Sequence, residues 1–337
     1  MSLFDSFWVL LVLKMLAIAL VIPAASLAII YAELKISAHM QSRIGPYFAG
    51  GRYGWAQPLA DGLKFFQKED LVPEHADRKV FKIAPMISLM GTVAVFVVIP
   101  FSPRLIVRDL DLGIFYALAA GSVGMVGVLV AGWSSGNKYS LMGGLRAAAQ
   151  LIAYELPLVL AVIGVAIQAG TLSMVGIVEA QKETLFTIGG FEIALPYVLA
   201  GQAVGFVIFL IGTLAELNRI PFDMPVAESE LVMGYLTEYS GIRFTMFFLA
   251  EYAGMFSMGA IAATLFLGGY HVPGLSDEIF GPFIVAGKAT LLVFVFIWMR
   301  WTFPRFREDQ LQSLAWKWLV PIALANIAVT AILKVAF

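Results

Sequence analysis

"FTMFFLAEYAGMFSMGAIAATLFLG" (residues 244–268) is one of the long apolar stretches that decide the fold of this chain. A run of about 20 apolar residues is long enough to cross the hydrocarbon core of a bilayer as an α-helix. The only charged residue in the stretch is Glu251, which lies ~10 Å from its start at ~1.5 Å per helical residue. The stretch therefore predicts a transmembrane helix that carries a carboxylate inside the membrane.

The composition of the whole chain points to a membrane protein. Of its 337 residues 60% are apolar and 13% are charged, with a mean hydropathy of +0.87. Soluble domains are about half apolar and about a quarter charged. Cysteine is absent, which excludes thiolate-held iron–sulfur clusters, thiolate zinc sites and disulfides. The three histidines are scattered and no glycine-rich phosphate loop is present, so any redox cofactor is expected in a partner.

Eight stretches are predicted to span the membrane, near residues 4–30, 81–101, 113–133, 147–168, 196–215, 244–268, 283–300 and 316–336. The start, MSLFDSFWVL, lacks a basic region and a cleavage site, which indicates a retained first span. An even number of spans places both termini on one side. The odd-numbered loops hold 16 Lys and Arg residues and the opposite loops hold 4. This bias predicts cytoplasmic odd-numbered loops and termini on the periplasmic side.

The predicted fold class is therefore an all-α polytopic membrane protein with a single integral membrane domain, residues 1–337. In the first cytoplasmic segment, 33–80, helical spacing places four apolar side chains on one face: Trp55, Leu59, Leu63 and Phe66. The opposite face has Asp61, Lys64 and Lys68. This pattern favours a short amphipathic helix at the membrane surface, with a solvated linker helix as the alternative.

Three ionisable residues inside predicted spans stand out as functional candidates. An ionisable group in a span costs about 2.5–3.5 kcal/mol on insertion scales, so it normally faces protein or water and marks a pathway. Glu155 lies ~12 Å into the fourth span, and Pro157 leaves the carbonyl of Ala153 without its helical partner. Glu251 is the second case, and Lys14 is the third, whose long stem can snorkel. The alternative is that each acid pairs with an Arg or Tyr to fix packing.

An acidic cytoplasmic loop, 216–243, is expected between the fifth and sixth spans. Its sequence, "AELNRIPFDMPVAESELVMGYLTEYSG" (215–241), has Arg219 as the only cation among five carboxylates: Glu216, Asp223, Glu228, Glu230 and Glu238. A desolvated carboxylate among like charges has a pKa raised toward neutrality, as a proton relay requires. Glu216 ends the fifth span and is placed to join the buried acids to the loop.

These motifs identify a resemblance that runs almost end to end. The chain resembles the membrane-embedded H subunit of respiratory complex I, called NADH dehydrogenase subunit 1 in mitochondria. The densest matching stretches are "QSRIGP" (41–46), "QPLADGLKFFQKE" (57–69), "AGWSSGNKYSLMGGLRAAAQLIAYE" (131–155), "AELNRIPFD" (215–223), "AESELVMGY" (227–235), "TEYSG" (237–241) and "PRFREDQL" (304–311).

The resemblance implies a function in proton-pumping NADH:quinone oxidoreductase of a bacterial plasma (inner) membrane. The family helps to build the chamber where ubiquinone or menaquinone is reduced, while iron–sulfur clusters and FMN belong to partner subunits. No cofactor is expected on this chain itself, and no activity is expected from it alone. Its expected partners are peripheral-arm quinone-site subunits, small membrane-arm subunits, quinone and lipid, but no nucleic acid.

The resemblance also implies roles for individual residues. The carboxylate chain for proton relay and coupling takes in Glu155, Glu216, Asp223, Glu228, Glu230, Glu238 and Glu251. The quinone chamber takes in Glu33, Arg43, Asp61, Glu69, Arg219, Arg300 and Arg305, and no metal site is expected.

The sequence departs from the family pattern at three positions. Leu34 follows Glu33 where the family usually has Arg, which removes a cation near the quinone entrance. Val226 stands where the family usually has one more Glu, and Tyr47 follows "GP" where Asn is common. Either of the first two changes can retune quinone type or loop charge.

Three other functions stay open at this point. Related membrane subunits occur in hydrogenases and in F420H2- or ferredoxin-linked complexes, although their loop motifs match more loosely. A stand-alone ion-coupled transporter is less favoured, because no pseudo-repeat links 1–168 with 169–337. A structural anchor for the peripheral arm leaves the buried acids unexplained.

Overall fold

The structure is a computed structural model that describes residues 7–182, 186–188, 191–193 and 195–336. Its elements follow in chain order: α1 (Phe7–Met40), α2 (Gln57–Gln67), α3 (Arg78–Val95), α4 (Gly113–Ser134), α5 (Lys138–Ala169), α6 (Met174–Lys182), β1 (Phe186–Ile188), β2 (Phe191–Ile193), α7 (Ala203–Glu216), α8 (Glu228–Leu231), the 3₁₀ turn η2 (Gly234–Leu236), α9 (Gly241–Phe266), α10 (Asp277–Thr302), α11 (Glu308–Leu314), the π-helical stretch η3 (Ala315–Leu319) and α12 (Val320–Ala336).

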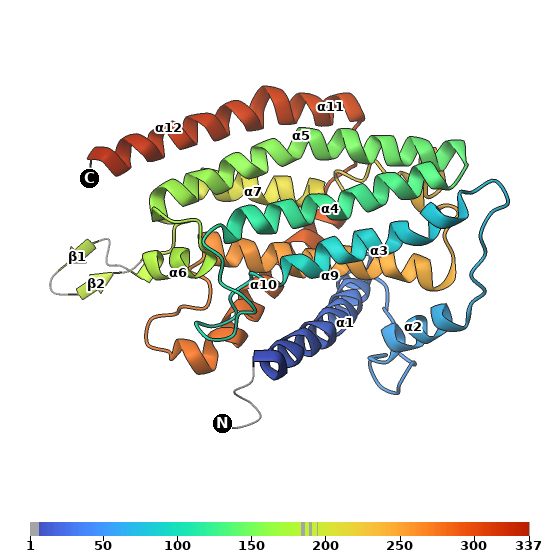
Figure 1. Cartoon of the computed structure of the whole chain (residues 1–337), viewed down its shortest axis with the longest axis horizontal. Helices are drawn as coiled ribbons and strands as arrows, with labels where there is room; N and C mark the ends of the chain where they lie inside the picture. Colours follow the sequence, from blue (N-terminus) through green and yellow to red (C-terminus); the bar gives the residue numbers. More distant parts are fainter. Residues whose placement is uncertain (1–6, 183–185, 189–190, 194, 337) are drawn as a thin grey trace.

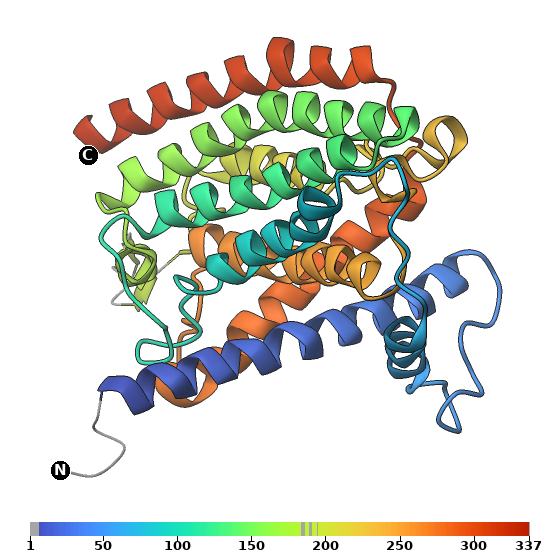
Figure 2. The same cartoon turned by 45° about the vertical axis from the view of Figure 1, so that its right-hand side comes forward.

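The helices form one bundle around α9. Every residue from Tyr252 to Phe266 is buried, and α9 packs against α1, α3 and α10. Helix α5 lies between α4 on one side and α11–α12 on the other (Figures 1 and 2). Helix α1 begins and α12 ends at the same end of the bundle, and α2 lies at the opposite end (Figures 1 and 2). This arrangement agrees with an even number of crossings, and the periplasmic placement of the termini stays a prediction.

The fold is helical, apart from the antiparallel pair β1–β2. Among the described residues, six helical segments are long and apolar enough to cross a membrane: 11–40, 113–134, 138–169, 241–266, 277–302 and 308–336. The predicted count of eight spans is thus not confirmed. Helix α3 has 18 residues, three of them basic, and α7 has 14. At ~1.5 Å per residue, α7 is ~21 Å long and shorter than the ~30 Å hydrocarbon core.

The predicted fifth span, 196–215, is helical only from Ala203 onward. Residues 195–202 form turns instead, and Gly201 has φ +99°, a conformation that side chains with a Cβ rarely adopt. The protein satisfies this irregular backbone, since Val198 N–H donates to the carbonyl of Phe266 at 3.0 Å and Tyr197 N–H donates to Gln181 Oε1 at 3.2 Å. Non-helical backbone is tolerated at membrane depth when it is enclosed by protein in this way.

Local sequence signals fix the ends of α5, which carries Glu155. Asn137 is the N-cap, and its side chain accepts a hydrogen bond from Tyr139 N–H at 2.9 Å. Gly170 closes the helix with φ +74°, the left-handed conformation that glycine adopts at helix C-termini. Pro157 lies within the helix, which continues for 12 further residues to Ala169.

The predicted amphipathic helix is present as α2. Its Pro58 is buried, whereas Trp55, Leu59, Leu63 and Phe66 are exposed. An exposed apolar face of this kind suits a membrane surface better than a solvated linker.

Candidate functional site

A buried charged cluster lies where α1, α9, α10 and the loop after α7 meet. Asn218 has φ +51°, a left-handed conformation that Asn tolerates, and the turn directs Arg219 into the bundle. The Arg219 side chain is 4% exposed. Its Nη1 lies 3.1 Å from both carboxylate oxygens of Glu33, and its Nε lies 2.8 Å from Oε1 of Glu251. Arg300 forms a second ion pair with Glu33.

This cluster is balanced in formal charge. Glu33 and Glu251 contribute two negative charges, while Arg219 and Arg300 contribute two positive charges. The guanidinium of Arg219 also lies 4.6 Å from the ring centre of Tyr252, a cation–π contact. Buried charges are tolerated only when such partners replace the lost water. The structure therefore brings together four of the predicted site residues from distant parts of the chain.

A cavity of about 190 Å³ adjoins this cluster. Glu216, Asp223, Glu228 and Glu251 line it, together with Arg219 and Arg300. The Glu251 side chain is 28% accessible and is one of the side chains that line the cavity. Val226 also lines the cavity, so this departure from the family pattern makes one part of its wall apolar. A space walled by several carboxylates and two guanidiniums can hold water and proton-exchanging groups.

Asp223 is the loop carboxylate with the clearest shift in pKa. Burial and, to a lesser degree, the negative charge of Glu251 raise the pKa of Asp223 to about 7, although Arg300, Arg305 and Arg219 oppose the rise. A carboxyl with such a pKa is half protonated near neutral pH. Asp223 is therefore suited to accept and release protons under physiological conditions.

Glu216 connects the large cavity to a smaller one. It lines the cavity just described and also a space of about 10 Å³ that Glu155 lines from α5. The carboxylate of Glu216 forms no hydrogen bond or ion pair with any residue that the structure describes, whereas Glu155 accepts a hydrogen bond from Ser122 at 2.5 Å. Glu155 is half-buried at the side of the bundle, between exposed Ile152 and Leu156.

Two other loop carboxylates lie away from the cavity. Glu230 is exposed and binds Arg305 and Arg146, the latter with Nη1 at 2.6 Å from Oε2. The hydrogen bond from Arg146, and the charges of both arginines, hold the pKa of Glu230 below its ordinary value although slight burial opposes this. Glu238 accepts a hydrogen bond from Asn137 Nδ2 at 2.6 Å. The structure therefore does not bring Glu230 or Glu238 into the group that lines the cavity.

The residues expected at the chamber mouth lie around α2. Arg43 is exposed and donates to Gln41 Oε1 at 2.6 Å. Asp61 is half-buried and accepts a hydrogen bond from Gln57 Nε2 at 3.1 Å. Glu69 is exposed, and its backbone carbonyl accepts from Ser240 Oγ at 3.2 Å. None of the three lines the cavity beside Arg219.

Sequence reasoning missed several polar neighbours of these acids. Gln150 Nε2 donates to the carbonyl of Ala215 at 2.6 Å and to Asn218 Oδ1 at 3.2 Å, so it holds the end of α7 next to Glu216. Tyr235 lines the cavity, and burial raises its pKa well above the ordinary value. The sequence did hold a signal for Gln150. It is a polar residue inside a predicted span, one turn after Arg146 and five residues before Glu155.

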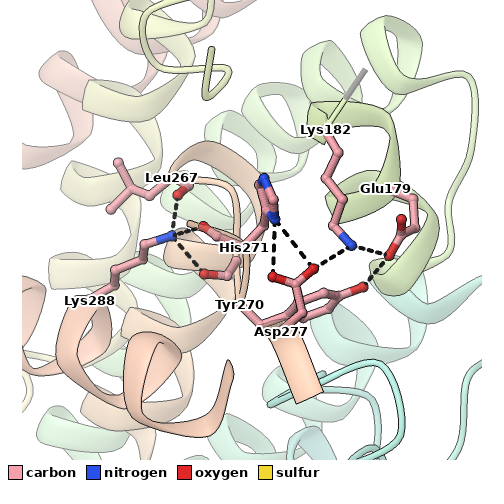
Figure 3. Close-up of polar contacts among 8 residues, drawn as sticks. Glu179, Lys182, Leu267, Tyr270, His271, Asp277 and Lys288 are labelled. Atoms are coloured by element: carbon pink, nitrogen blue, oxygen red, sulfur yellow. Dashed lines mark hydrogen bonds and ion pairs between the residues drawn. The ribbon is translucent and has the colours of Figure 1, made fainter. Parts of the chain in front are cut away.

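A second polar cluster, drawn in Figure 3, lies around the loop that follows the C-terminal end of α9 at Phe266. Lys288 Nζ donates to the carbonyls of Leu267 and Gly269, each at 2.7 Å, and to that of His271 at 3.1 Å. These contacts tie the α9–α10 loop to α10. They account for a lysine that the sequence places inside a span, because backbone carbonyls satisfy all three of its N–H groups.

The same end of the bundle holds a chain of paired charges (Figure 3). Lys182 on α6 binds Glu179 at 2.6 Å and Asp277 at 2.8 Å, and His271 Nδ1 lies 3.0 Å from Asp277. Burial opposes the charge on Lys182, but its hydrogen bonds to Asp277 and Glu179 outweigh burial and raise its pKa. No group of three or more metal-binding side chains is found within the described parts of the chain.

Comparison with known proteins connects this geometry to a family. The family model described as NADH dehydrogenase matches residues 13–331. The H subunit of NADH-quinone oxidoreductase from Bacillus cytotoxicus is 47% identical over 91% of this chain and 89% of its own length. The corresponding proteins of Geobacillus kaustophilus and Anoxybacillus flavithermus are 46% and 47% identical over the same shares.

These similarities extend beyond the short motifs to nearly the whole bundle. They favour the first of the functions considered from the sequence over a hydrogenase-linked protein or a stand-alone transporter. The absence of cysteine agrees with a subunit that holds no thiolate-bound iron–sulfur cluster of its own. The chain belongs to the NADH dehydrogenase subunit 1 family and is a multi-pass membrane component, the H subunit, of NADH-quinone oxidoreductase.

Proposed function

We propose that the chain forms much of the quinone-binding chamber of the enzyme and carries a carboxylate relay. The relay couples quinone reduction to proton translocation without electron transfer through this chain. The observation that supports it best is the position of Glu216, which lines both the large cavity with Asp223 and the small cavity with Glu155. One carboxylate thus adjoins both the acidic loop and the interior of the bundle.

Elementary electrostatics predicts that the protonation of the carboxylates in this loop responds strongly to the charge created by quinone reduction. Reduction creates negative charge in or near the chamber and draws protons there. Two unit charges about 4 Å apart interact by ~4 kcal/mol at an effective dielectric of 20, which corresponds to about three pKa units. Because the pKa of Asp223 is raised to about 7, a further rise of this size takes it from about half protonated to almost fully protonated at neutral pH.

The proposed route runs from Asp223 and Glu228 through Glu216 to Glu155, with Glu251 at the cavity wall. From Glu155, at the side of the bundle, protons pass onward to membrane-arm partners. In this scheme Glu230 and Glu238 hold the 216–243 loop in place through Arg305 and Asn137.

Packing alone accounts for only part of these acids. Glu251 pairs with Arg219, as the structural alternative predicts. Glu155 and Glu216, in contrast, have no cationic partner among the described residues. A structural anchor has no use for two unpaired carboxylates that border one small cavity, so the relay explains more of the site.

The quinone chamber requires more than this chain. Pockets for small molecules usually measure about 300–1,000 Å³, and the cavity here has about 190 Å³. We infer that peripheral-arm subunits, which hold the iron–sulfur clusters and FMN, complete the chamber against the face that carries Arg43, Asp61 and Glu69. That face is then cytoplasmic in the bacterial inner membrane, and both termini lie on the periplasmic side.

A photoreactive quinone analogue tests the chamber in the assembled enzyme. We expect labelled peptides from the 33–80 segment and from the 216–243 loop, because the predicted mouth and cavity residues lie there. An excess of unmodified quinone should suppress this labelling. Labelling that is confined to other subunits, or that unmodified quinone does not suppress, contradicts a chamber built from this chain.

The relay predicts a specific pH dependence at Asp223. The raised pKa means that Asp223 keeps its proton through the acid range and loses it as the pH rises through about 7. The proton-to-electron ratio of the native enzyme should therefore change between about pH 6 and pH 8. In D223N the amide cannot titrate, so the ratio should be low and should not change with pH. Asp309→Asn at an exposed ion pair is the control, and an unaltered pH profile in D223N argues against the relay.

A further inference from the structure

The gap between Glu216 and Glu155 needs a connecting group. The two carboxylates border one small space, but no hydrogen bond joins them in the part of the chain that the structure describes. The space measures about 10 Å³, which is near the lower limit for one water molecule. Between two carboxylates that share no hydrogen bond, a proton passes only through a hydroxyl or a water that lies between them.

Helix α4 supplies contacts to both acids from two consecutive residues. Ser122 Oγ lies 2.5 Å from Oε1 of Glu155. Gly121 lies against Glu216, since a Cβ at this position would be 2.8 Å from Oε1 of that carboxylate. Real Cβ atoms essentially never approach an atom so closely, so the absence of a side chain at Gly121 allows Glu216 to reach this part of α4.

The Ser122 hydroxyl has two acceptors for one hydrogen. It lies 2.5 Å from Glu155 and 3.0 Å from the carbonyl of Leu118, one turn earlier on the same helix. When Glu155 is ionised, the hydroxyl donates to it. When Glu155 is protonated, its own O–H can donate to Ser122 Oγ while the serine hydrogen turns to Leu118.

We propose that Gly121 and Ser122 form the bridge of the relay, with Ser122 as a proton-carrying hydroxyl between Glu155 and a water beside Glu216. In the forward step the Glu216 O–H bond breaks and the water receives that proton. The water gives one of its protons to Ser122 Oγ, and Ser122 gives its original proton to Glu155. Glu216 ends ionised, Glu155 ends protonated, and the water and the serine are unchanged in composition.

This inference rests on the proposed relay. It adds to the relay Ser122, a residue whose side chain is neither an acid nor a base. A purely structural serine in a membrane helix returns its hydrogen bond to its own helix, as Ser26 does with the carbonyl of Ile22 at 2.8 Å. Ser122 also has this option, yet its shorter contact is with a carboxylate on another helix. Ser26 is therefore a matched control for loss of a hydroxyl inside the bundle.

The test uses the assembled enzyme in sealed vesicles, with proton pumping and NADH:quinone turnover measured together. We expect Ser122→Ala to slow coupled turnover by about tenfold, the effect of one lost hydrogen bond to a charged group. Ser122→Thr keeps the hydroxyl and should restore the rate, and Ser26→Ala should leave it unchanged. The solvent isotope effect on pumping should change in Ser122→Ala, because a different proton transfer then limits the rate.

Gly121→Ala is the second variant, and it tests the other half of the bridge. Alanine favours the helix, so this change should not harm folding, but its methyl group displaces the carboxylate of Glu216. We expect slower pumping without loss of assembly. Gly287→Ala in α10, where a Cβ meets nothing within 4 Å, is the control.

An infrared measurement reads the contact directly. The carbonyl stretch of protonated Glu155, identified by its loss in Glu155→Gln, should shift in Ser122→Ala and keep its position in Ser122→Thr. If Ser122→Ala pumps at the native rate while Glu216→Gln does not, the bridge is overturned and the relay stands. If both variants pump normally, the relay falls together with the bridge.

Discussion

Replacing Glu216 by Gln in the assembled enzyme is expected to reduce proton pumping by about 100-fold, the lower end of what a positioned proton-transfer group contributes. Glutamine keeps the size of the side chain but cannot carry the proton. Glu216 is the one residue that lines both the cavity with Asp223 and the smaller space with Glu155 among the residues that the structure describes. Its loss therefore interrupts the proposed route at a single position.

The measurement separates coupling from assembly. NADH oxidation by a soluble artificial acceptor, which needs no quinone, should remain normal in Glu216→Gln. Glu278→Gln is the control, because Glu278 is an exposed carboxylate paired with Arg104 at the other end of the bundle. A proton-to-electron ratio and a pumping rate equal to those of the native enzyme would falsify the relay role of Glu216.

Replacing Arg219 by Met is expected to destabilise the assembled protein by about 3–5 kcal/mol, the cost of leaving a buried charge without its partner. Arg300 still pairs with Glu33 in this variant, so Glu251 is the carboxylate left alone. The effect is measured by heating the purified complex and recording the temperature at which this chain is lost from it. The Met side chain fills the space, so lost volume contributes little.

A second substitution identifies the cause. In Arg219→Met/Glu251→Gln the unpaired charge is gone, so much of the stability should return, and a double-mutant cycle gives the coupling of the two residues. Arg307→Met, at a fully exposed ion pair with Asp309, should unfold like the native protein. Equal losses of stability in the single and double variants would show that Arg219 acts through something other than its charge.

The sequence predicted the helical class, the presence of the short helix α2 and most span positions, because long apolar runs and helical spacing are local signals. It overestimated the regularity of the fifth span. The segment 195–202 is as apolar as its neighbours, and its turns depend on contacts with Gln181 and Phe266, which are distant in sequence. The small hairpin β1–β2 was also not predicted, because three-residue strands carry little pattern.

The composition of the site was predictable, but its connections were not. Charges inside spans marked Glu155 and Glu251, and the resemblance added Glu33 and Arg300. Nothing in the order of residues indicates that Arg219 is shared by Glu33 and Glu251, or that Glu230 turns away toward Arg146. Ser122 was missed for a related reason, since a lone serine in a membrane helix usually bonds to its own backbone.

The wide sequence separation within the Arg219 cluster has a consequence for biosynthesis. Glu33 lies 186 residues before Arg219 and 267 residues before Arg300, so it leaves the ribosome long before either cation exists. The nascent first helix therefore carries an unpaired acid near the end of its apolar run, where a charged carboxylate opposes insertion. The long apolar run before it offsets that effect during translation. The four charges of this cluster balance only after α10, which carries Arg300, has been inserted.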